Sequence, residues 1–390
     1  MVHMRLARQL IVVVVGLVFA GDASADAGKL IERASTEVAA YSDSDHVNVI
    51  TPSVKGQVEN PTAGWAIDGS YLVDVISAAS VDIVSTASRR WEEVRQGGSL
   101  GGSYKRGDWG ASVSGSLSSE PDYFSYAIGG YVTRDFDERN LSLIAGYGFG
   151  HDLIGRAGTP FSVYSHSFDH HALTLGVTKV IDRATTLALT GDVKFQEGDS
   201  SKPYRYIPLF YAETAASVPV GASLATVQNL RLPQSVIEAL PLSRQRYALT
   251  ARLAHRFAHA TTRLETMVYD DSWDLEGFLA DGRHLFDLAP RWSIGPHARY
   301  YVQSAASFWK LAYVGGSGSV PTYRTGDREL GPLMNLTAGA SARWSVGPKS
   351  RIDEWILGAS FDTTYTGFFD DLYIKRRVSA LLALSLEGTW

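Results

Sequence analysis

A ladder of arginines is the most distinctive chemical pattern in the sequence. Four arginines of the segment 243–258 occupy even positions: Arg244, Arg246, Arg252 and Arg256. The odd positions carry large apolar side chains: Tyr247, Leu249, Leu253 and Phe257. Side chains alternate between the two faces of a β-strand, so this segment predicts a strand with one basic and one apolar face. Fixed cations along a pore set its ion preference, and the ladder would favour anionic solutes or polymers.

Acidic residues on neighbouring segments offer a second interpretation of the ladder. Glu265 and Asp271 lie on the next segment, and Asp281 and Asp287 lie beyond it. Carboxylates at these positions could form ion pairs with the arginines and stabilise the contact between neighbouring strands. We favour this interpretation, because charges in a lumen are commonly paired or hydrated.

A second polar set lies in the segment 63–75, where Asp68 and Asp74 share one parity with Ser70. At the rise of a strand the two carboxylates are about 20 Å apart, too far for the paired carboxylates of a glycosidase. We expect both to be hydrated lumen groups. The full set of predicted pore-lining residues is Arg244, Arg246, Arg252, Arg256, Glu265, Asp68, Asp74, Arg299 and Arg343.

Three histidines and a carboxylate gather in one short stretch: His166, Asp169, His170 and His171. Imidazole and carboxylate groups bind transition metals, but a metal site also needs fixed geometry and supporting hydrogen bonds. Chance grouping in a hydrophilic loop is therefore the favoured interpretation. No serine or histidine stands out as a catalytic residue. We expect no enzyme, no cofactor and no metal.

The elements that position these residues are strands of about ten residues with alternating faces, the pattern of a transmembrane barrel. Sixteen approximate strands can be assigned, and the even number fits bacterial single-chain barrels. They are 33–43, 46–58, 63–75, 91–105, 108–118, 122–135, 139–150, 168–181, 184–197, 243–258, 260–271, 274–291, 296–308, 330–345, 351–366 and 371–390. The predicted fold is all-β, a single antiparallel transmembrane β-barrel.

The connections between these strands divide into short and long ones. The predicted periplasmic turns are Asn60-Pro61, 106–108, 135–138, 182–183, 259–260, 293–296 and 347–349. The long connections, expected outside the cell, are 76–90, 151–167, 198–242 and 309–329. The loop 198–242 contains five prolines. It could fold into the pore as a constriction, cap the barrel or contact a partner.

Tryptophan positions provide a further test, because barrels carry aromatic girdles at both membrane interfaces. Six tryptophans are predicted at the periplasmic interface: Trp65, Trp109, Trp292, Trp344, Trp355 and Trp390. The other three, Trp91, Trp273 and Trp309, are expected toward the outer rim.

The N-terminal segment has the features of a secretory signal peptide. Arg5 and Arg8 precede an apolar run over 10–20, and Ala23-Ser24-Ala25 matches a cleavage site. The run is shorter than the roughly 20 residues of a spanning helix. We therefore expect a signal peptide over 1–25 and a barrel over 26–390. The chain contains no cysteine, which excludes disulfides and thiolate metal sites, and its net charge of −5 gives no reason to expect nucleic-acid binding.

The final strand ends on an aromatic residue. Its segment 378–390 has an apolar face that finishes at Trp390. It resembles the last strand of Gram-negative outer-membrane barrels, where a terminal aromatic belongs to the signal read by the barrel-assembly machinery. The resemblance implies an outer-membrane location in a Gram-negative bacterium, with membrane lipid and that machinery as partners.

Two further segments resemble the bacterial family catalogued as domain of unknown function 3570. They are 71–82, with the sequence YLVDVISAASVD, and 299–308, with the sequence RYYVQSAASF. The resemblance implies a secreted outer-membrane protein and supplies no activity or catalytic residue. Some barrels of this general kind accompany exopolysaccharide-secretion systems, so polysaccharide-secretion components are possible partners.

Three functions therefore remain open. The chain is expected to be a channel for polar solutes or a secreted polymer, since barrels of this size enclose an aqueous channel unless they are plugged. One alternative is the exit barrel of an exopolysaccharide-secretion system that works with periplasmic partners. The other is a plugged barrel that acts as a scaffold or receptor through its outer loops.

Overall fold

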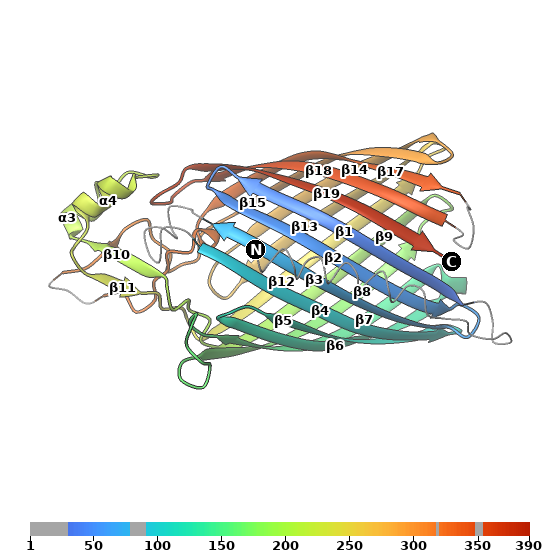
Figure 1. Ribbon diagram of the computed structural model, residues 1–390, viewed down its shortest axis with the longest axis horizontal. Coiled ribbons are helices and arrows are strands. Elements are labelled where there is room, and N and C mark those ends of the chain that lie inside the picture. Colours follow the sequence, from blue (N-terminus) through green and yellow to red (C-terminus); the bar gives the residue numbers. More distant parts are fainter. Residues whose placement is uncertain (1–29, 79–90, 317–319, 348–353) are drawn as a thin grey trace, which may run out of the picture.

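The protein is a closed antiparallel barrel of sixteen strands, as the sequence predicted (Figure 1). The computed structural model describes residues 30–78, 91–316, 320–347 and 354–390. Each barrel strand pairs with its neighbours along the chain, and the barrel closes where β1 (Ile31–Asp43) pairs with β19 (Arg376–Thr389). The predicted signal peptide over 1–25 lies outside the described residues.

Every predicted strand overlaps one strand of the barrel. The other fourteen are β2 (Val47–Asn60), β3 (Trp65–Ala78), β4 (Trp91–Arg106), β5 (Trp109–Ser119), β6 (Tyr123–Phe136), β7 (Leu141–Ile154), β8 (His166–Val180), β9 (Thr185–Gly198), β12 (Ser243–Arg256), β13 (Ala260–Asp271), β14 (Gly277–Ala289), β15 (Trp292–Gln303), β17 (Leu333–Val346) and β18 (Glu354–Phe368).

The outer face of the barrel is apolar. Large hydrophobic side chains on alternate strand positions are exposed there, among them Leu100, Val113, Leu117, Ile128, Leu175 and Leu249. So continuous an apolar surface is unfavourable in water, whereas it matches the hydrocarbon core of a lipid bilayer. The protein is therefore an outer-membrane barrel, and the opposite face of each strand, the lumen face, points into its interior. None of the helices in the described part of the chain is long and apolar enough to span a membrane.

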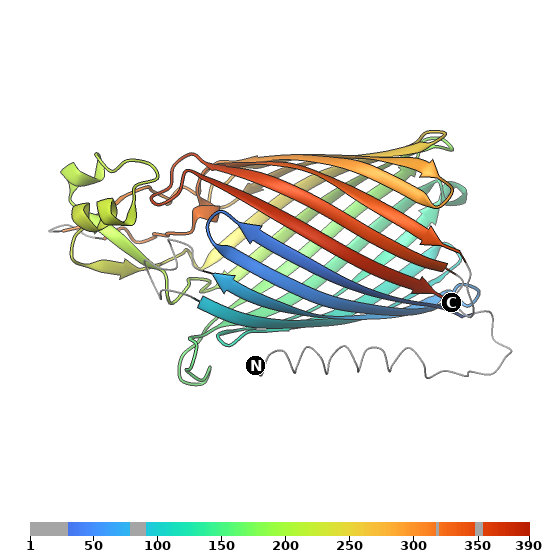
Figure 2. The ribbon, with the colours of Figure 1, turned by 45° about the horizontal axis from the view of Figure 1, so that its top comes forward.

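The two ends of the barrel differ (Figure 2). The C-terminus lies at the end with short turns, including the 3₁₀ turn η1 (Asp137–Arg139). The turn after β2 is so tight that a side chain at Gly64 would overlap the carbonyl group of Lys105, and Gly64 has a positive φ of 80° that glycine adopts without strain. The residues beyond 78 of the predicted loop 76–90, and most of the predicted turn 347–349, lie outside the described residues.

One predicted turn is wrong. Residues 293–296 belong to β15, which begins at Trp292 and pairs with β17 from that residue onward. The Gly295-Pro296 pair resembles a turn signal, but Pro296 disturbs only one side of the strand. Pairing with β14 is interrupted next to it, while pairing with β17 is continuous. Proline lacks the N–H group that one neighbour requires, and the other neighbour keeps the strand in place.

The long loop between β9 and β12 folds into a small subdomain beyond the outer end of the barrel, on the left of Figure 1. It contains β10 (Tyr206–Phe210), α3 (Ala212–Ala215), α4 (Leu224–Leu230) and β11 (Ser235–Ile237), and β16 (Tyr313–Val314) completes its sheet. We call residues 199–242 together with β16 the cap. Two apolar clusters form its core, around Tyr313 and around Phe210.

Ionic contacts fix the cap to the neighbouring outer loop, which contains the 3₁₀ turn η2 (Arg328–Leu330). Arg205 pairs with Glu238 at 3.1 Å and with Asp327 at 2.9 Å. Thr325 donates a hydrogen bond to the same buried Glu238. Of the arrangements that the sequence left open for 198–242, these contacts correspond to a cap.

The aromatic side chains at the two ends behave differently. Trp292 and Trp344 stack on adjacent strands at the short-turn end, with ring centroids 5.4 Å apart. Trp390 donates a hydrogen bond to Glu32 of β1 at the same end. Trp273 and Trp309 lie toward the outer rim as expected, but they pack into an apolar cluster of the outer loops instead of forming an interface girdle. The side chain of Trp91 lies outside the described part.

Candidate functional site

The arginine ladder lies on the lumen face and is largely neutralised by carboxylates. Arg252 Nε is 2.5 Å from Glu265 Oε2, because the register places these two residues opposite each other. Arg256 pairs with Asp287 at 2.5 Å. At the outer end, Arg244 pairs with the buried Asp271 and covers the ring of Trp273. Three of the four arginines are thus braced by the acidic residues on the next strands.

Arg246 is the exception in this ladder. Its Nε donates to the hydroxyl group of Tyr269 at 2.8 Å, and none of the ion pairs in the described residues includes it. Lys194 lies directly opposite on β9. The ladder therefore keeps a positive site near its outer end.

Asp281 forms a hub on the adjacent strand β14. Its carboxylate lies 2.8 Å from Arg299 Nε, 2.7 Å from His297 Nε2 and 3.5 Å from Arg283 Nε. His297 bonds through its other nitrogen to Asp362 at 2.7 Å. This last contact crosses β17 at Gly339, where any side chain would overlap the Asp362 carboxylate.

The remaining predicted pore-lining residues also fall on the lumen face. Asp74 pairs with Arg95 at 2.5 Å and accepts a hydrogen bond from Thr51. Asp68 lies against Gly101 of β4, and Arg343 lies opposite Ser293 of β15. The structure separates Asp68 from the arginine ladder, which occupies another part of the wall. The roles of all nine residues in transport stay predictions.

Several of these charged side chains are open to solvent inside the barrel. The exposed fractions of the Arg252, Arg256 and Arg283 side chains are 54, 51 and 51%. Since these arginines project from the lumen face, their exposure marks a water-accessible interior. From Arg244 to Arg256 the ladder spans about 40 Å of strand.

The wall formed by β4 to β7 is different, because the central part of its lumen face carries mostly small side chains. They are Gly97, Ser99, Gly101, Ser103, Ser112, Ser114, Ser116, Ser118, Ser125, Ala127, Gly129, Gly148 and Gly150. Tyr131 is an exception and lies flat on Gly146. The segment 97–101 matches the pattern G-x-S-x-G, but it lies within β4, whereas a nucleophile elbow joins a strand to a helix.

The histidine-rich stretch does not form one site. His166 and His170 face the lumen and contact Asp199 and Asp152, respectively. His171 faces outward, where its ring bonds to Tyr147. Successive side chains on β8 point to opposite faces, so the three imidazoles cannot converge on one metal ion.

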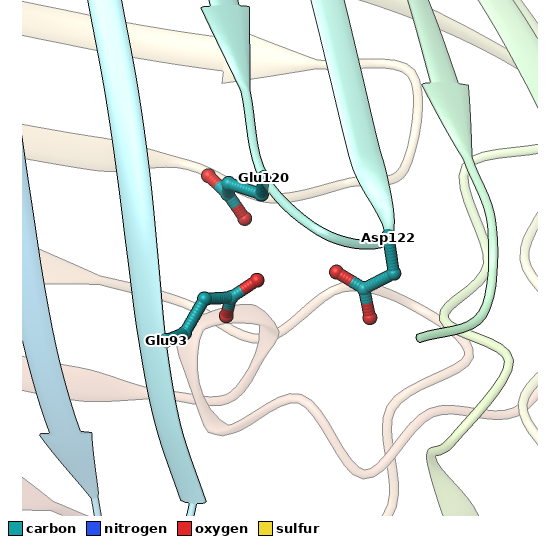
Figure 3. A group of neighbouring side chains, drawn as sticks. All are labelled: Glu93, Glu120 and Asp122. Carbon is teal, nitrogen blue, oxygen red and sulfur yellow. The ribbon is translucent and has the colours of Figure 1, made fainter. Parts of the chain in front are cut away.

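A cavity of 690 Å³ lies at the outer mouth, between the rim of the barrel and the cap. Aromatic residues such as Tyr123, Tyr204 and Trp309 line it, together with the basic residues Lys202 and Arg328. The cavity adjoins a group that sequence reasoning missed, formed by Glu93, Glu120 and Asp122 (Figure 3). Burial is the main cause that raises the pKa of Glu120, which lies in the turn after β5. No sequence signal would have found this group, because β5 separates Glu93 from the other two.

No curated protein matches the chain. Among solved structures, a bacterial polysaccharide outer membrane secretin matches with 6% identity and a TM-score of 0.46, over 94% of this chain and 100% of that one. CdiB from Acinetobacter baumannii matches with 9% identity and a TM-score of 0.47, over 92 and 60%. A loop-deletion mutant of OmpT from Vibrio cholerae matches with 8% identity and a TM-score of 0.43, over 94 and 100%.

These structural likenesses carry no argument about activity. The family comparison is more specific, because one family model covers residues 83–356. The chain belongs to the family described as protein of unknown function (DUF3570).

Proposed function

We propose that the protein is an outer-membrane channel that passes polar solutes or a secreted polymer. The observation that carries this proposal is the exposure of Arg252, Arg256 and Arg283 on the lumen face. Charged side chains that keep half of their surface exposed inside a barrel require water around them. A barrel of sixteen strands is wide enough to enclose an aqueous channel.

The asymmetry of the lumen supports passage of an extended polar molecule. Small and hydroxyl side chains on β4 to β7 leave space along one wall, and serine hydroxyls both donate and accept hydrogen bonds. The charged wall on β12 to β15 supplies alternating cations and carboxylates. An uncharged polyhydroxylated molecule would find hydrogen-bond partners on both walls without a deep binding site that would hold it.

A narrower version of this proposal makes the protein the exit barrel of an exopolysaccharide-secretion system. Its lumen would then serve a polymer delivered by periplasmic partners. The two versions differ in cargo, so deletion of the gene separates them. Loss of surface polysaccharide with unchanged uptake of small solutes is expected for an exit barrel, and the reverse result is expected for a general channel.

The folded cap favours a second candidate function, that of a receptor or scaffold. The cap has its own apolar core, yet Tyr211 and Leu242 remain exposed on it. In this case a partner would bind the cap, and the lumen would not conduct. Deletion of residues 206–237 distinguishes the candidates, because a channel should gain conductance when its cap is removed, whereas a receptor should lose its partner.

Proteoliposomes test the channel directly with neutral sugars of graded size. A barrel with an open lumen should release small sugars and retain polymers above a size limit. Ser114→Trp places a large ring among the small side chains on the lumen face of β5 and should lower the size limit for sugar release. Leu117→Trp, on the lipid-facing side of the same strand, is the matched control and should leave it unchanged. Retention of the smallest sugars by a correctly folded wild-type barrel would overturn the proposal.

A further inference from the structure

Three carboxylates converge at the outer rim of the barrel. Glu93 lies near the start of β4, and Glu120 and Asp122 lie in the turn between β5 and β6. One oxygen from each carboxylate lies within 4.8 Å of the others. Figure 3 shows the three side chains pointing toward one another from these two elements. We call Glu93, Glu120 and Asp122 the acidic trio.

The burial of Glu93 separates this group from an ordinary acidic patch. Glu93 is only 4% exposed, and its Oε2 atom is buried without a hydrogen-bond partner. A buried carboxylate oxygen in a native protein is nearly always bound by a donor or a cation. One carboxylate oxygen of Glu93 points between Glu120 and Asp122 (Figure 3), so an ion at the centre of the acidic trio would bind this buried carboxylate.

Neighbouring cations do not supply that partner. Among the described residues, no ion pair joins a lysine, arginine or histidine to any member of the acidic trio. Arg95, two residues from Glu93, pairs instead with Asp74. The Nζ atom of Lys202 lies over the ring of Tyr123, 4.9 Å from its centroid. Carboxylates held this close, one of them buried, repel one another unless a cation or a shared proton lies between them.

We propose that the acidic trio is a binding site for a divalent cation, with Ca²⁺ as the preferred ion. The ligands are all carboxylate oxygens, which suit hard cations rather than zinc or copper. Two oxygens bound to one Ca²⁺ at about 2.4 Å lie at most about 4.8 Å apart, so the spacing of the trio is compatible with shared ligation of one Ca²⁺. Mg²⁺ needs shorter bonds and a stricter octahedral geometry.

The surroundings provide further ligands and a route of entry. Glu120 and Asp122 line the 690 Å³ cavity at the mouth, which offers room for water ligands. A bound ion would join β4 to the turn between β5 and β6. That turn is in contact with the next outer loop, because the amide of Gly155 donates to the carbonyl of Asp122 at 2.7 Å. The ion would therefore restrict the motion of the barrel rim next to the cap.

Direct calcium binding tests this site independently of transport. The chain without its predicted signal segment is refolded from denaturant into detergent, so that no lipopolysaccharide carries calcium. Equilibrium dialysis with radioactive Ca²⁺ should show saturable binding of a single ion per chain. Mg²⁺ at the same concentration should compete poorly. Absence of saturable Ca²⁺ binding by a folded barrel would overturn the proposal, whatever the barrel conducts.

Substitutions then locate the ion. Glu93→Gln and Glu120→Gln should each weaken Ca²⁺ binding by about tenfold or more, the scale of losses seen when metal ligation is disturbed. Glu213→Gln removes an exposed carboxylate of the cap and should bind Ca²⁺ as the wild type does. Heat-modifiable migration on gels verifies that each variant is folded, and Glu120 lies in a turn where substitution leaves the strands intact. Equal Ca²⁺ affinity of Glu120→Gln, Glu213→Gln and the wild type would contradict the assignment.

Discussion

The substitution Asp281→Asn should make the lumen more selective for anions. Asp281 is the shared partner of Arg283, Arg299 and His297. The asparagine has nearly the same shape and keeps a hydrogen-bond acceptor for Arg299, so the wall should hold its structure. The substitution leaves the positive charges of Arg283 and Arg299 on the lumen face without their carboxylate. The side chain of Arg283 is already half exposed, so its unpaired positive charge would act on ions that pass through the lumen.

The size of the effect follows from the Coulomb energy in water. The interaction energy between one unit charge and a monovalent ion in water is about 1 kcal/mol at 4 Å and about half that at 8 Å. The added charge stabilises chloride and destabilises potassium by the same energy, so the permeability ratio of chloride to potassium should rise by roughly five- to thirtyfold at low salt. At 1 M salt the Debye length falls to about 3 Å, and most of the shift should disappear.

Reversal potentials under a salt gradient in planar bilayers measure this ratio. Arg283→Gln provides the matched opposite change, because it removes a positive charge from the same hub and should shift selectivity toward cations. Shifts of the same sign in both variants would refute the electrostatic reasoning, since a general disturbance of the wall does not depend on the sign of the charge. An Asp281→Asn barrel that conducts with unchanged selectivity would refute it as well.

Two further predictions concern stability and can be tested separately. Gly339→Ala should destabilise the barrel against urea by about 1–3 kcal/mol, the usual cost of overpacking, because the new methyl group would displace Asp362. Gly191→Ala, where a methyl group meets no atom within 4 Å, is the control and should be neutral or slightly stabilising; equal losses would contradict the steric account. Arg205→Met should release the cap, because it leaves the buried carboxylate of Glu238 without its cation, at a cost of about 3–5 kcal/mol. Limited proteolysis should then cleave the cap while the barrel stays resistant, and a resistant cap would show that Arg205 does not fix it.

The strands were predictable from sequence because the bilayer and the lumen impose opposite demands on alternate residues. The ladder on β12 shows this directly, with arginines on one face and Tyr247, Leu249 and Leu253 on the other. Pairing of the ladder with carboxylates was also predictable, since antiparallel neighbours bring a polar face against a polar face. The same alternation of apolar and polar residues indicates a transmembrane barrel, and such barrels lie in the outer membrane.

Features that depend on contacts between distant segments were not predictable. The Gly295-Pro296 pair carries the local signal of a turn, and only its pairing with β17 keeps it in a strand. Trp273 ends a strand like an interface tryptophan, yet the outer loops bury it. The acidic trio depends on the register of β4 against β5, which places Glu93 beside a turn that begins 27 positions later in the sequence.

Single-channel recording tests the central claim most directly. Folded wild-type barrel inserted into a planar bilayer should conduct in discrete, ohmic steps. Removal of cap residues 206–237 should raise the step size or the open time, because it widens the outer mouth without altering the lumen. A membrane that contains heat-modifiable barrel and shows no conductance, with or without the cap, would contradict the claim that the lumen is a continuous aqueous path.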